Sequence, residues 1–183
     1  KIKEINREYI KCEIIEQILE NIESNVNIDL YQGLPKIDKM EYIIQKATEL
    51  GVRDIYPVIT KRCIVKLDEK LKTKKIERWQ KIAEVAAKQS KRDYIPKIEN
   101  AINLENICQN IEKYDIILLA YEDEANNTLK HELKILAENK TQKIKIGIII
   151  GPEGGLDIEE VNKLKEAGAK IITLGKRILR TET

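Results

Sequence analysis

Hydrophobic and polar residues alternate along this chain in blocks, and the blocks predict strands and helices in turn. Runs rich in β-branched residues are too short for helices, which is typical of strands buried inside a sheet. Such runs cover residues 54–60, 114–120, 145–151 and 170–174. Apolar residues recur at helical spacing elsewhere, as Met40, Ile43, Ile44 and Ala47, as Ile76, Trp79, Ala83 and Ala86, within residues 129–137, and as Ile158, Val161 and Leu164. This alternation of strand and helix predicts an α/β fold with a parallel sheet.

The beginning of the chain has a weaker pattern. Residues 9–17 alternate weakly and predict a strand, and residues 29–32 predict a second short strand after a polar turn at 21–27. Gly33, Leu34 and Pro35 then interrupt the pattern. We therefore predict a domain boundary at this point, with an N-terminal module over residues 1–33 and the main domain over residues 34–183. The strand at 54–60 would then be the first strand of the main sheet.

A glycine loop follows the most apolar strand, as Gly151-Pro152-Glu153-Gly154-Gly155. Asp157 and Glu160 follow in capping-box spacing and predict the start of a helix. Ligands bind beyond the carboxyl ends of parallel strands, so this loop is a candidate site. P-loop and dinucleotide spacings are absent, which disfavours phosphate, and Glu153 suits a neutral, zwitterionic or cationic ligand. The alternative is a turn that binds nothing.

Composition excludes several classes of protein. The chain has 183 residues and 42% hydrophobic content, enough for one packed domain and part of another. It has no apolar run of membrane-spanning length and its first residues are too charged for a signal peptide, so we expect a soluble, cytoplasmic protein. Cys12, Cys63 and Cys108 are widely spaced, which predicts reduced thiols that fill the core and no metal site. His131 lies in a polar helix and is expected to be solvated.

Positive charge is concentrated in one segment. Residues 61–92 contain twelve basic and four acidic residues, although the net charge of the chain is only +2. Such a segment could bind the phosphates of RNA, and its affinity would fall with salt. The alternative is a solvated helix face in a chain that is rich in lysine throughout.

The glycine loop and a second glycine-marked segment resemble a known class of enzymes. GPEGGLDIEEV at 151–161 and LGKRILRTET at 174–183 are similar to the SPOUT class of S-adenosylmethionine-dependent RNA methyltransferases. Within that class the chain resembles the bacterial family that methylates N3 of a uridine in 16S ribosomal RNA of the small subunit. The resemblance covers the chain from about Leu30 onward, through residues 39–41, 45–51 and 62–63, and through Trp79, Gln89 and Arg92.

The resemblance implies a fold and an assembly. SPOUT proteins tie their last strands into a deep trefoil knot that holds the cofactor, and a second subunit completes the site, so a homodimer is expected. The family begins with a small β-barrel resembling a PUA RNA-binding domain, of which residues 1–33 would be the end. Relatives continue beyond Thr183 through a helix that closes the knot, and we expect this helix to be missing here.

The resemblance also implies site residues. The backbone of three loops would bind S-adenosylmethionine, through Leu119, Ala120, Tyr121, Glu122, Gly151, Pro152, Glu153, Gly154, Gly155, Leu174, Gly175, Arg177, Ile178 and Leu179. The residues assigned to RNA binding are Lys39, Lys46, Arg62, Gln89 and Arg92. No metal is expected.

The chemistry of uracil suggests what the catalytic residues must do. N3 is protonated at neutral pH, so the enzyme must loosen that proton and stabilise charge on the uracil oxygens. Arg180 is the first choice for the electrostatic role; Glu153 or Glu182 could act as base, and Glu153 could instead brace its loop. The alternatives in function are an RNA-binding α/β module without catalysis, and a SPOUT methyltransferase that acts on another RNA nucleotide.

Overall fold

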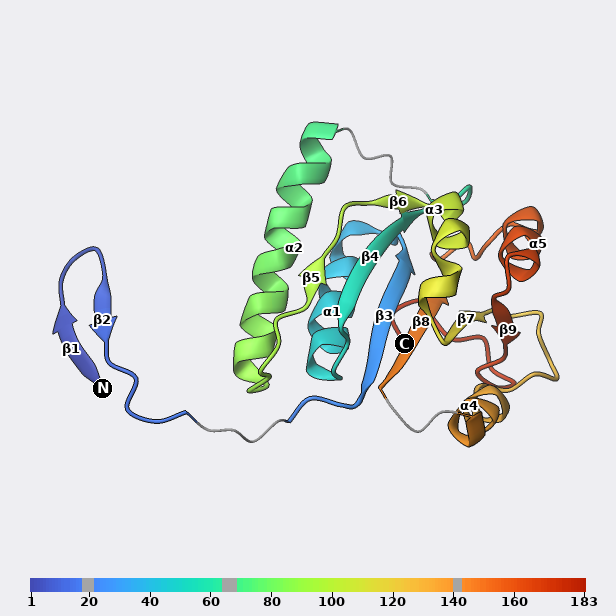
Figure 1. Ribbon diagram of the computed structural model, residues 1–183. Coiled ribbons are helices and arrows are strands. Elements are labelled where there is room, and N and C mark those ends of the chain that lie inside the picture. Colours follow the sequence, from blue (N-terminus) through green and yellow to red (C-terminus); the bar gives the residue numbers. More distant parts are fainter. Residues whose placement is uncertain (18–21, 64–68, 140–142) are drawn as a thin grey trace.

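The computed structural model describes residues 1–17, 22–63, 69–139 and 143–183. Within these ranges one parallel sheet of seven strands forms the centre of the molecule, in the order β5-β4-β3-β8-β7-β9, with β6 also paired to β4 (Figure 1). The strands are β3 (Val26–Gly33), β4 (Asp54–Ile59), β5 (Lys97–Ile98), β6 (Ile102–Asn103), β7 (Ile116–Ala120), β8 (Ile144–Ile150) and β9 (Lys170–Ile172). The predicted α/β class and parallel sheet are confirmed.

Helices cover both faces of this sheet. They are α1 (Ile37–Glu49), α2 (Glu69–Gln89), α3 (Leu104–Gln109), α4 (Leu129–Asn139) and α5 (Ile158–Glu166), with a short 3₁₀ helix at Ile111–Lys113. On one face, Met40 and Ile44 of α1 pack with Trp79 of α2 over Ile55 of β4. On the other face, Leu164 of α5 packs with residues of α3, β7 and β8. Helix α4 covers the far half of the first face, around Leu118, Ile146 and Ile172.

Strand β3 lies in the middle of the sheet and precedes β4, so the prediction that the strand at 54–60 is the first of the main sheet is wrong. Strand β3 pairs with β4 on one side and with β8 on the other, from Val26 opposite Ile144 to Gln32 opposite Ile150. The central place of β3 could not be predicted from the sequence because the strand contains polar residues. Asp29 and Gln32 are each 1% exposed. Oδ2 of Asp29 accepts a hydrogen bond of 2.6 Å from the Tyr114 hydroxyl and lies 3.3 Å from Nζ of Lys145, so one oxygen of this buried carboxylate has specific partners.

The first residues form a separate hairpin. Strands β1 (Ile2–Ile5) and β2 (Ile10–Cys12) pair antiparallel, and their side chains are exposed. Figure 1 shows this hairpin standing apart from the sheet. The strand predicted over residues 9–17 is thus confined to 10–12, and part of the turn predicted at 21–27 lies outside the described residues.

Several predicted side-chain positions can be compared with the structure. Trp79 is 3% exposed and anchors the core of α2, as expected. Val161 and Leu164 are buried as predicted, but Ile158, the first residue of α5, is 55% exposed, and Leu156 before the helix is buried. All three thiols are free; Cys63 and Cys108 are half-buried, whereas Cys12 lies exposed in the hairpin and does not fill a core. His131 is exposed on α4.

Candidate active site

Parallel strands bring the predicted loops to one edge of the sheet. Because β3, β4, β7, β8 and β9 run in the same direction, the segments that follow them all leave from their carboxyl ends. The glycine loop follows β8, near the centre of this edge. It can therefore contact the loops after β3, β4 and β7.

Two glycines allow this close contact. A Cβ on Gly33, at the end of β3, would lie 2.6 Å from Cδ of Pro152 and 2.7 Å from its backbone nitrogen. Gly155 has a φ of +66°, and a Cβ there would lie 2.7 Å from a carboxylate oxygen of Glu122 in the loop after β7. A side chain at Gly33 would push the rigid Pro152 away, whereas one at Gly155 would be strained by the positive φ and would displace the Glu122 carboxylate. The predicted segments at 120–122 and 151–155 are thus neighbours in space.

The loop after β4 lies against the other side of the glycine loop. Arg62 donates a hydrogen bond of 3.2 Å from Nη1 to the Gly154 carbonyl, and its Nη2 is 3.5 Å from the Asp157 carboxylate. Glu160 accepts hydrogen bonds from the backbone nitrogens of Asp157 and Lys61, at 2.9 and 2.8 Å. The predicted capping box is present. Glu160 therefore both caps the start of α5 and holds the loop after β4 against that helix.

The C-terminal segment, residues 173–183, returns to the same edge. Thr181 donates a hydrogen bond of 2.7 Å to the Gly151 carbonyl, and Gln32 donates one of 2.9 Å to the Thr181 hydroxyl. Lys39 of α1 lies 3.3 Å from Glu153 and 3.1 Å from Glu182. Sequence reasoning did not assign Gln32 or Thr181 to the site. The signal that could have found Gln32 is a polar residue at the end of an otherwise apolar central strand.

The charges around Lys39 affect both candidate bases. Burial alone would raise the pKa of Glu153, but hydrogen bonds from backbone nitrogens and from Lys39 lower it below its ordinary value. The pKa of Glu182 is also lowered, by a backbone hydrogen bond and by Lys39. The pKa of Lys39 is raised, chiefly by its bond to Glu182. A lowered pKa makes each carboxylate a weaker proton acceptor, and each is paired with Lys39, which favours a bracing role over that of a base.

Apolar side chains are exposed in residues 174–179. Ile178 is 87% exposed, Leu174 49% and Leu179 42%. Gly175 has a φ of +119°, and a Cβ built there would meet no atom within 4 Å. Arg177 and Arg180 are exposed on the same segment. In contrast, Leu119 is fully buried at the end of β7, so it can offer a ligand only its backbone.

Arg92, which the sequence assigned to RNA binding, makes its hydrogen bonds away from the glycine loop. Its side chain is 6% exposed. Nη1 donates to the carbonyls of Thr48 and Val52, at 3.1 and 2.7 Å, and Nε and Nη2 donate to the Glu23 carboxylate, at 3.2 and 2.6 Å. The guanidinium is buried and pairs with these groups at the end of α1, which gives it a structural role in the fold.

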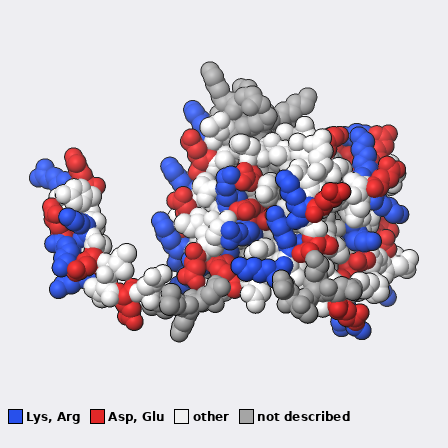
Figure 2. Space-filling view, viewed as in Figure 1, with Lys and Arg blue, Asp and Glu red and all other residues white. Residues whose placement is uncertain are grey.

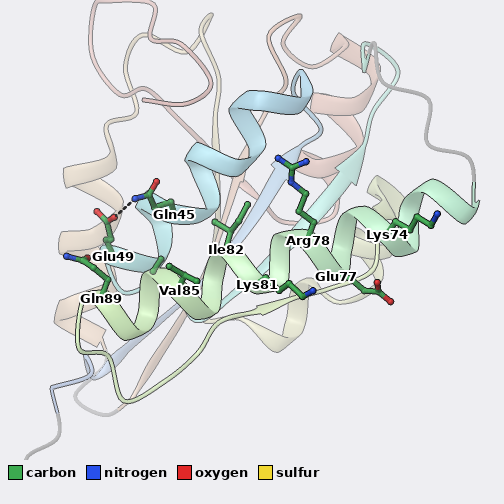
Figure 3. A pocket seen from close by; sticks show the side chains of 10 residues that line it. Gln45, Glu49, Lys74, Glu77, Arg78, Lys81, Ile82, Val85 and Gln89 are labelled. Carbon is green, nitrogen blue, oxygen red and sulfur yellow. Dashed lines mark hydrogen bonds between the residues drawn. The ribbon is translucent and has the colours of Figure 1, made fainter. Parts of the chain in front are cut away.

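Lys46 and Gln89 lie on the α1–α2 face, away from the glycine loop. Lys46 forms an ion pair of 2.8 Å with Glu49. Gln89 lines a groove of about 660 Å³ between the two helices, together with Gln45, Glu49, Lys74, Glu77, Arg78, Lys81, Ile82, Val85 and Ala86 (Figure 3). Figure 2 shows basic and acidic side chains mixed over the visible face. Arg78 is paired with Glu41 at 2.8 Å, and Lys66 of the basic segment lies outside the described residues.

Within the described ranges, none of the helices combines the length and the apolar character that crossing a membrane would require. The same residues contain no group of three or more His, Cys, Asp or Glu arranged to hold a metal ion.

Comparisons with known proteins agree on one family. A family model described as an RNA methyltransferase domain matches residues 22–183. Ribosomal RNA small subunit methyltransferase E of Bacillus subtilis is 37% identical over 183 residues, covering 100% of this chain and 72% of the relative. The protein of the same name from Mesomycoplasma hyopneumoniae is 39% identical over 173 residues, covering 94% and 72%.

Solved structures show the same likeness. A methyltransferase of Legionella pneumophila, in complex with its bound cofactor S-adenosylmethionine, has a TM-score of 0.85 and 31% identity, covering 99% of this chain and 71% of that one. A ribosomal RNA small subunit methyltransferase E of Neisseria gonorrhoeae, bound to S-adenosylmethionine, has a TM-score of 0.73 and 34% identity, covering 87% and 62%.

Proposed function

Because this chain belongs to the family of ribosomal RNA small subunit methyltransferase E, we propose that it methylates N3 of a uridine in 16S ribosomal RNA, with S-adenosylmethionine as methyl donor. The observation that carries the proposal is the meeting of the loops after β3, β4 and β7 and of the C-terminal segment around one glycine loop. A turn that only joined a strand to a helix would not need these contacts.

The residues at this edge fit the cofactor. Gly155 takes a backbone conformation that favours glycine, and Glu122 lies directly over it, so the loop presents main chain and not side chains. Gly175 leaves open space beside its backbone. The residues proposed to hold the cofactor are Leu119, Ala120, Tyr121, Glu122, Gly151, Pro152, Glu153, Gly154, Gly155, Leu174, Gly175, Arg177, Ile178 and Leu179. When bound, S-adenosylmethionine supplies a methyl group activated by its sulfonium.

Arg180 is the proposed catalytic residue. Its side chain is exposed beside the braced end of the C-terminal segment, and its charge contributes to the lowered pKa of Glu182. A guanidinium held there would stabilise the negative charge that develops on the uracil oxygens as N3 gives up its proton to a water molecule and takes the methyl group. Glu153 and Glu182 would hold the glycine loop and the C-terminal segment in place through Lys39.

RNA is proposed to approach over the loop after β4 and along α1 and α2. Arg62 lies on the glycine loop with an exposed side chain, so it can contact a phosphate next to the reacting nucleotide. Lys46 lies farther along α1 and Gln89 farther along α2, and basic residues of α2 line the groove between these two helices. Lys39 is better assigned to bracing, since it is already paired with two carboxylates.

The path of the chain supports the proposed trefoil knot. The C-terminal segment leaves β9 at the edge of the sheet, yet Thr181 contacts Gln32 of β3, on the far side of β7 and β8. This crossing is the kind of path that a knot requires. The exposed apolar residues Leu174, Ile178 and Leu179 would be covered by the cofactor and by a second subunit in the proposed homodimer.

The N-terminal hairpin is proposed to be the end of a PUA-like β-barrel. Because Val26–Gly33 lies in the main sheet, that module would end before residue 26, earlier than the boundary at 33 predicted from the sequence. We propose that the protein acts in the cytoplasm, on free 16S ribosomal RNA or on the small subunit.

Two measurements test the proposed function. Isothermal titration of the full-length protein with S-adenosylmethionine should give a saturable signal. If no binding is seen, the alternative of an RNA-binding module without catalysis would be favoured. Mass spectrometry of 16S ribosomal RNA from a strain that lacks the protein should show the loss of one N3-methyluridine. Loss of a different methylated nucleotide would favour a SPOUT methyltransferase with another target.

A further inference from the structure

Gln32 is a buried polar side chain at the carboxyl end of β3. It is 1% exposed and lies among apolar neighbours in the centre of the sheet. Burying an amide is costly unless its hydrogen bonds are satisfied, so the partners of Gln32 indicate what it does. Its Nε2 donates to the Gly33 carbonyl at 2.9 Å and to the Thr181 hydroxyl at 2.9 Å, with the Gly151 carbonyl at 3.5 Å.

Thr181 completes this small network. Its hydroxyl accepts from Gln32 and donates at 2.7 Å to the Gly151 carbonyl, so both of its hydrogen-bonding roles are used. The pair thereby joins the end of β3, the start of the glycine loop and the C-terminal segment. Thr183, the other hydroxyl residue of 174–183, makes no side-chain hydrogen bond to the described strands of the sheet.

The network lies between two parts of the proposed cofactor site. Gly151 begins the glycine loop, and Thr181 follows Arg180 directly in the C-terminal segment. A shift of the segment relative to the loop would displace both its backbone and Arg180. Precise placement of the reacting groups strongly affects rate and affinity. Buried side chains whose hydrogen bonds are all formed can hold those groups in place.

We propose that Gln32 and Thr181 are positioning residues that fix the C-terminal segment against the glycine loop in the geometry that binds S-adenosylmethionine. This inference rests on the proposed function. Gln32 lies in the central strand, far in sequence from both glycine-marked segments, and it would determine how these segments contact each other. The outer ion pairs of Lys39 with Glu153 and Glu182 support the same arrangement from the solvent side.

The test uses Thr181→Val in the full-length protein, because this change keeps the shape of the side chain and removes its hydroxyl. Thr183→Val is the matched control, since Thr183 is exposed on the same segment. Thr181→Val should weaken binding of S-adenosylmethionine about tenfold or more, which corresponds to the loss of one good hydrogen bond. Thr181→Ser should restore binding to within about threefold of wild type, and the control should not change it.

Hydrogen exchange gives a readout that needs no cofactor. In the ligand-free protein, amides of residues 176–183 should exchange faster in Thr181→Val than in wild type and the control. Gln32→Met should speed exchange of the same backbone amides. The double variant should exchange no faster than the faster of the two single variants, because both changes break one network.

Unchanged exchange and affinity in Thr181→Val would overturn the proposal, as would independent, multiplying effects of the two changes. If Gln32→Met fails to fold, Thr181→Val and its serine rescue still decide the question. If wild type binds no S-adenosylmethionine, the proposed function fails, while hydrogen exchange still reports whether the two residues hold the segment.

Discussion

Replacing Arg92 by methionine tests whether this arginine stabilises the fold or binds RNA. The change removes a guanidinium that donates to the Thr48 and Val52 carbonyls and to the Glu23 carboxylate, which keeps its hydrogen bonds from the backbone nitrogens of Asp93 and Tyr94. Each bond from a charged donor contributes about 1.5 kcal/mol, and breaking a buried ion pair costs about 3–5 kcal/mol. Because Glu23 is still 23% exposed, we expect the lower end, about 3 kcal/mol.

Thermal and urea unfolding measure this loss. For a chain of this length, about 3 kcal/mol lowers the melting temperature by about 6–12 °C. Lys88→Met is the control, because Lys88 is exposed in the last turn of α2 and its removal should change stability by no more than about 0.5 kcal/mol. If Arg92→Met melted within about 2 °C of wild type and instead lost affinity for RNA, the structural assignment of Arg92 would be refuted.

Three further outcomes are expected. Gly33→Ala should destabilise the protein by about 1–3 kcal/mol in urea unfolding and weaken cofactor binding in titration, because the new methyl group would press on Pro152; unchanged values for both would contradict the contact. The Arg92 hydrogen bond holds the pKa of Glu23 below its ordinary value of 4.5, so the pair contributes stability above that pH and loses it as pH falls through the lowered pKa. Melting curves between pH 3 and 7 should show this loss, and Glu23→Gln should remove this part of the pH dependence. Arg180→Ala should lower the rate constant of methylation about a hundredfold or more in single-turnover experiments and leave cofactor affinity within about threefold of wild type. An equal loss of rate and affinity would place Arg180 in cofactor binding.

The parts of the fold that depend on local pattern could be predicted from the sequence. The run at 145–151 and the stripe around Met40 gave a buried strand and a helix because apolar spacing alone determines such elements. The capping box at Asp157 was predictable for the same reason, since its partners lie three residues apart. The glycine loop could be recognised as a candidate site from its place after a buried strand.

What could not be predicted depends on residues that are distant in sequence. β3 contains Asp29 and Gln32, and only their partners Tyr114 and Thr181 show why a central strand tolerates them. Arg92 belongs to a basic segment, and nothing in its neighbourhood reveals that Glu23 and two carbonyls surround it. The short α3 helix, at Leu104–Gln109, lies in a stretch for which no element was predicted.

The central place of β3 has a consequence for the order in which the molecule is made. β3 pairs with β8, and the partners Gln32 and Gly151 are 119 residues apart in the chain. At about 5–20 residues per second, translation reaches β8 roughly 6–24 seconds after β3. Throughout that interval one edge of β3 has no partner strand, and an unpaired edge is where chains aggregate. The yield of native protein should therefore respond to the speed of synthesis between these strands, even in variants whose final stability is unchanged.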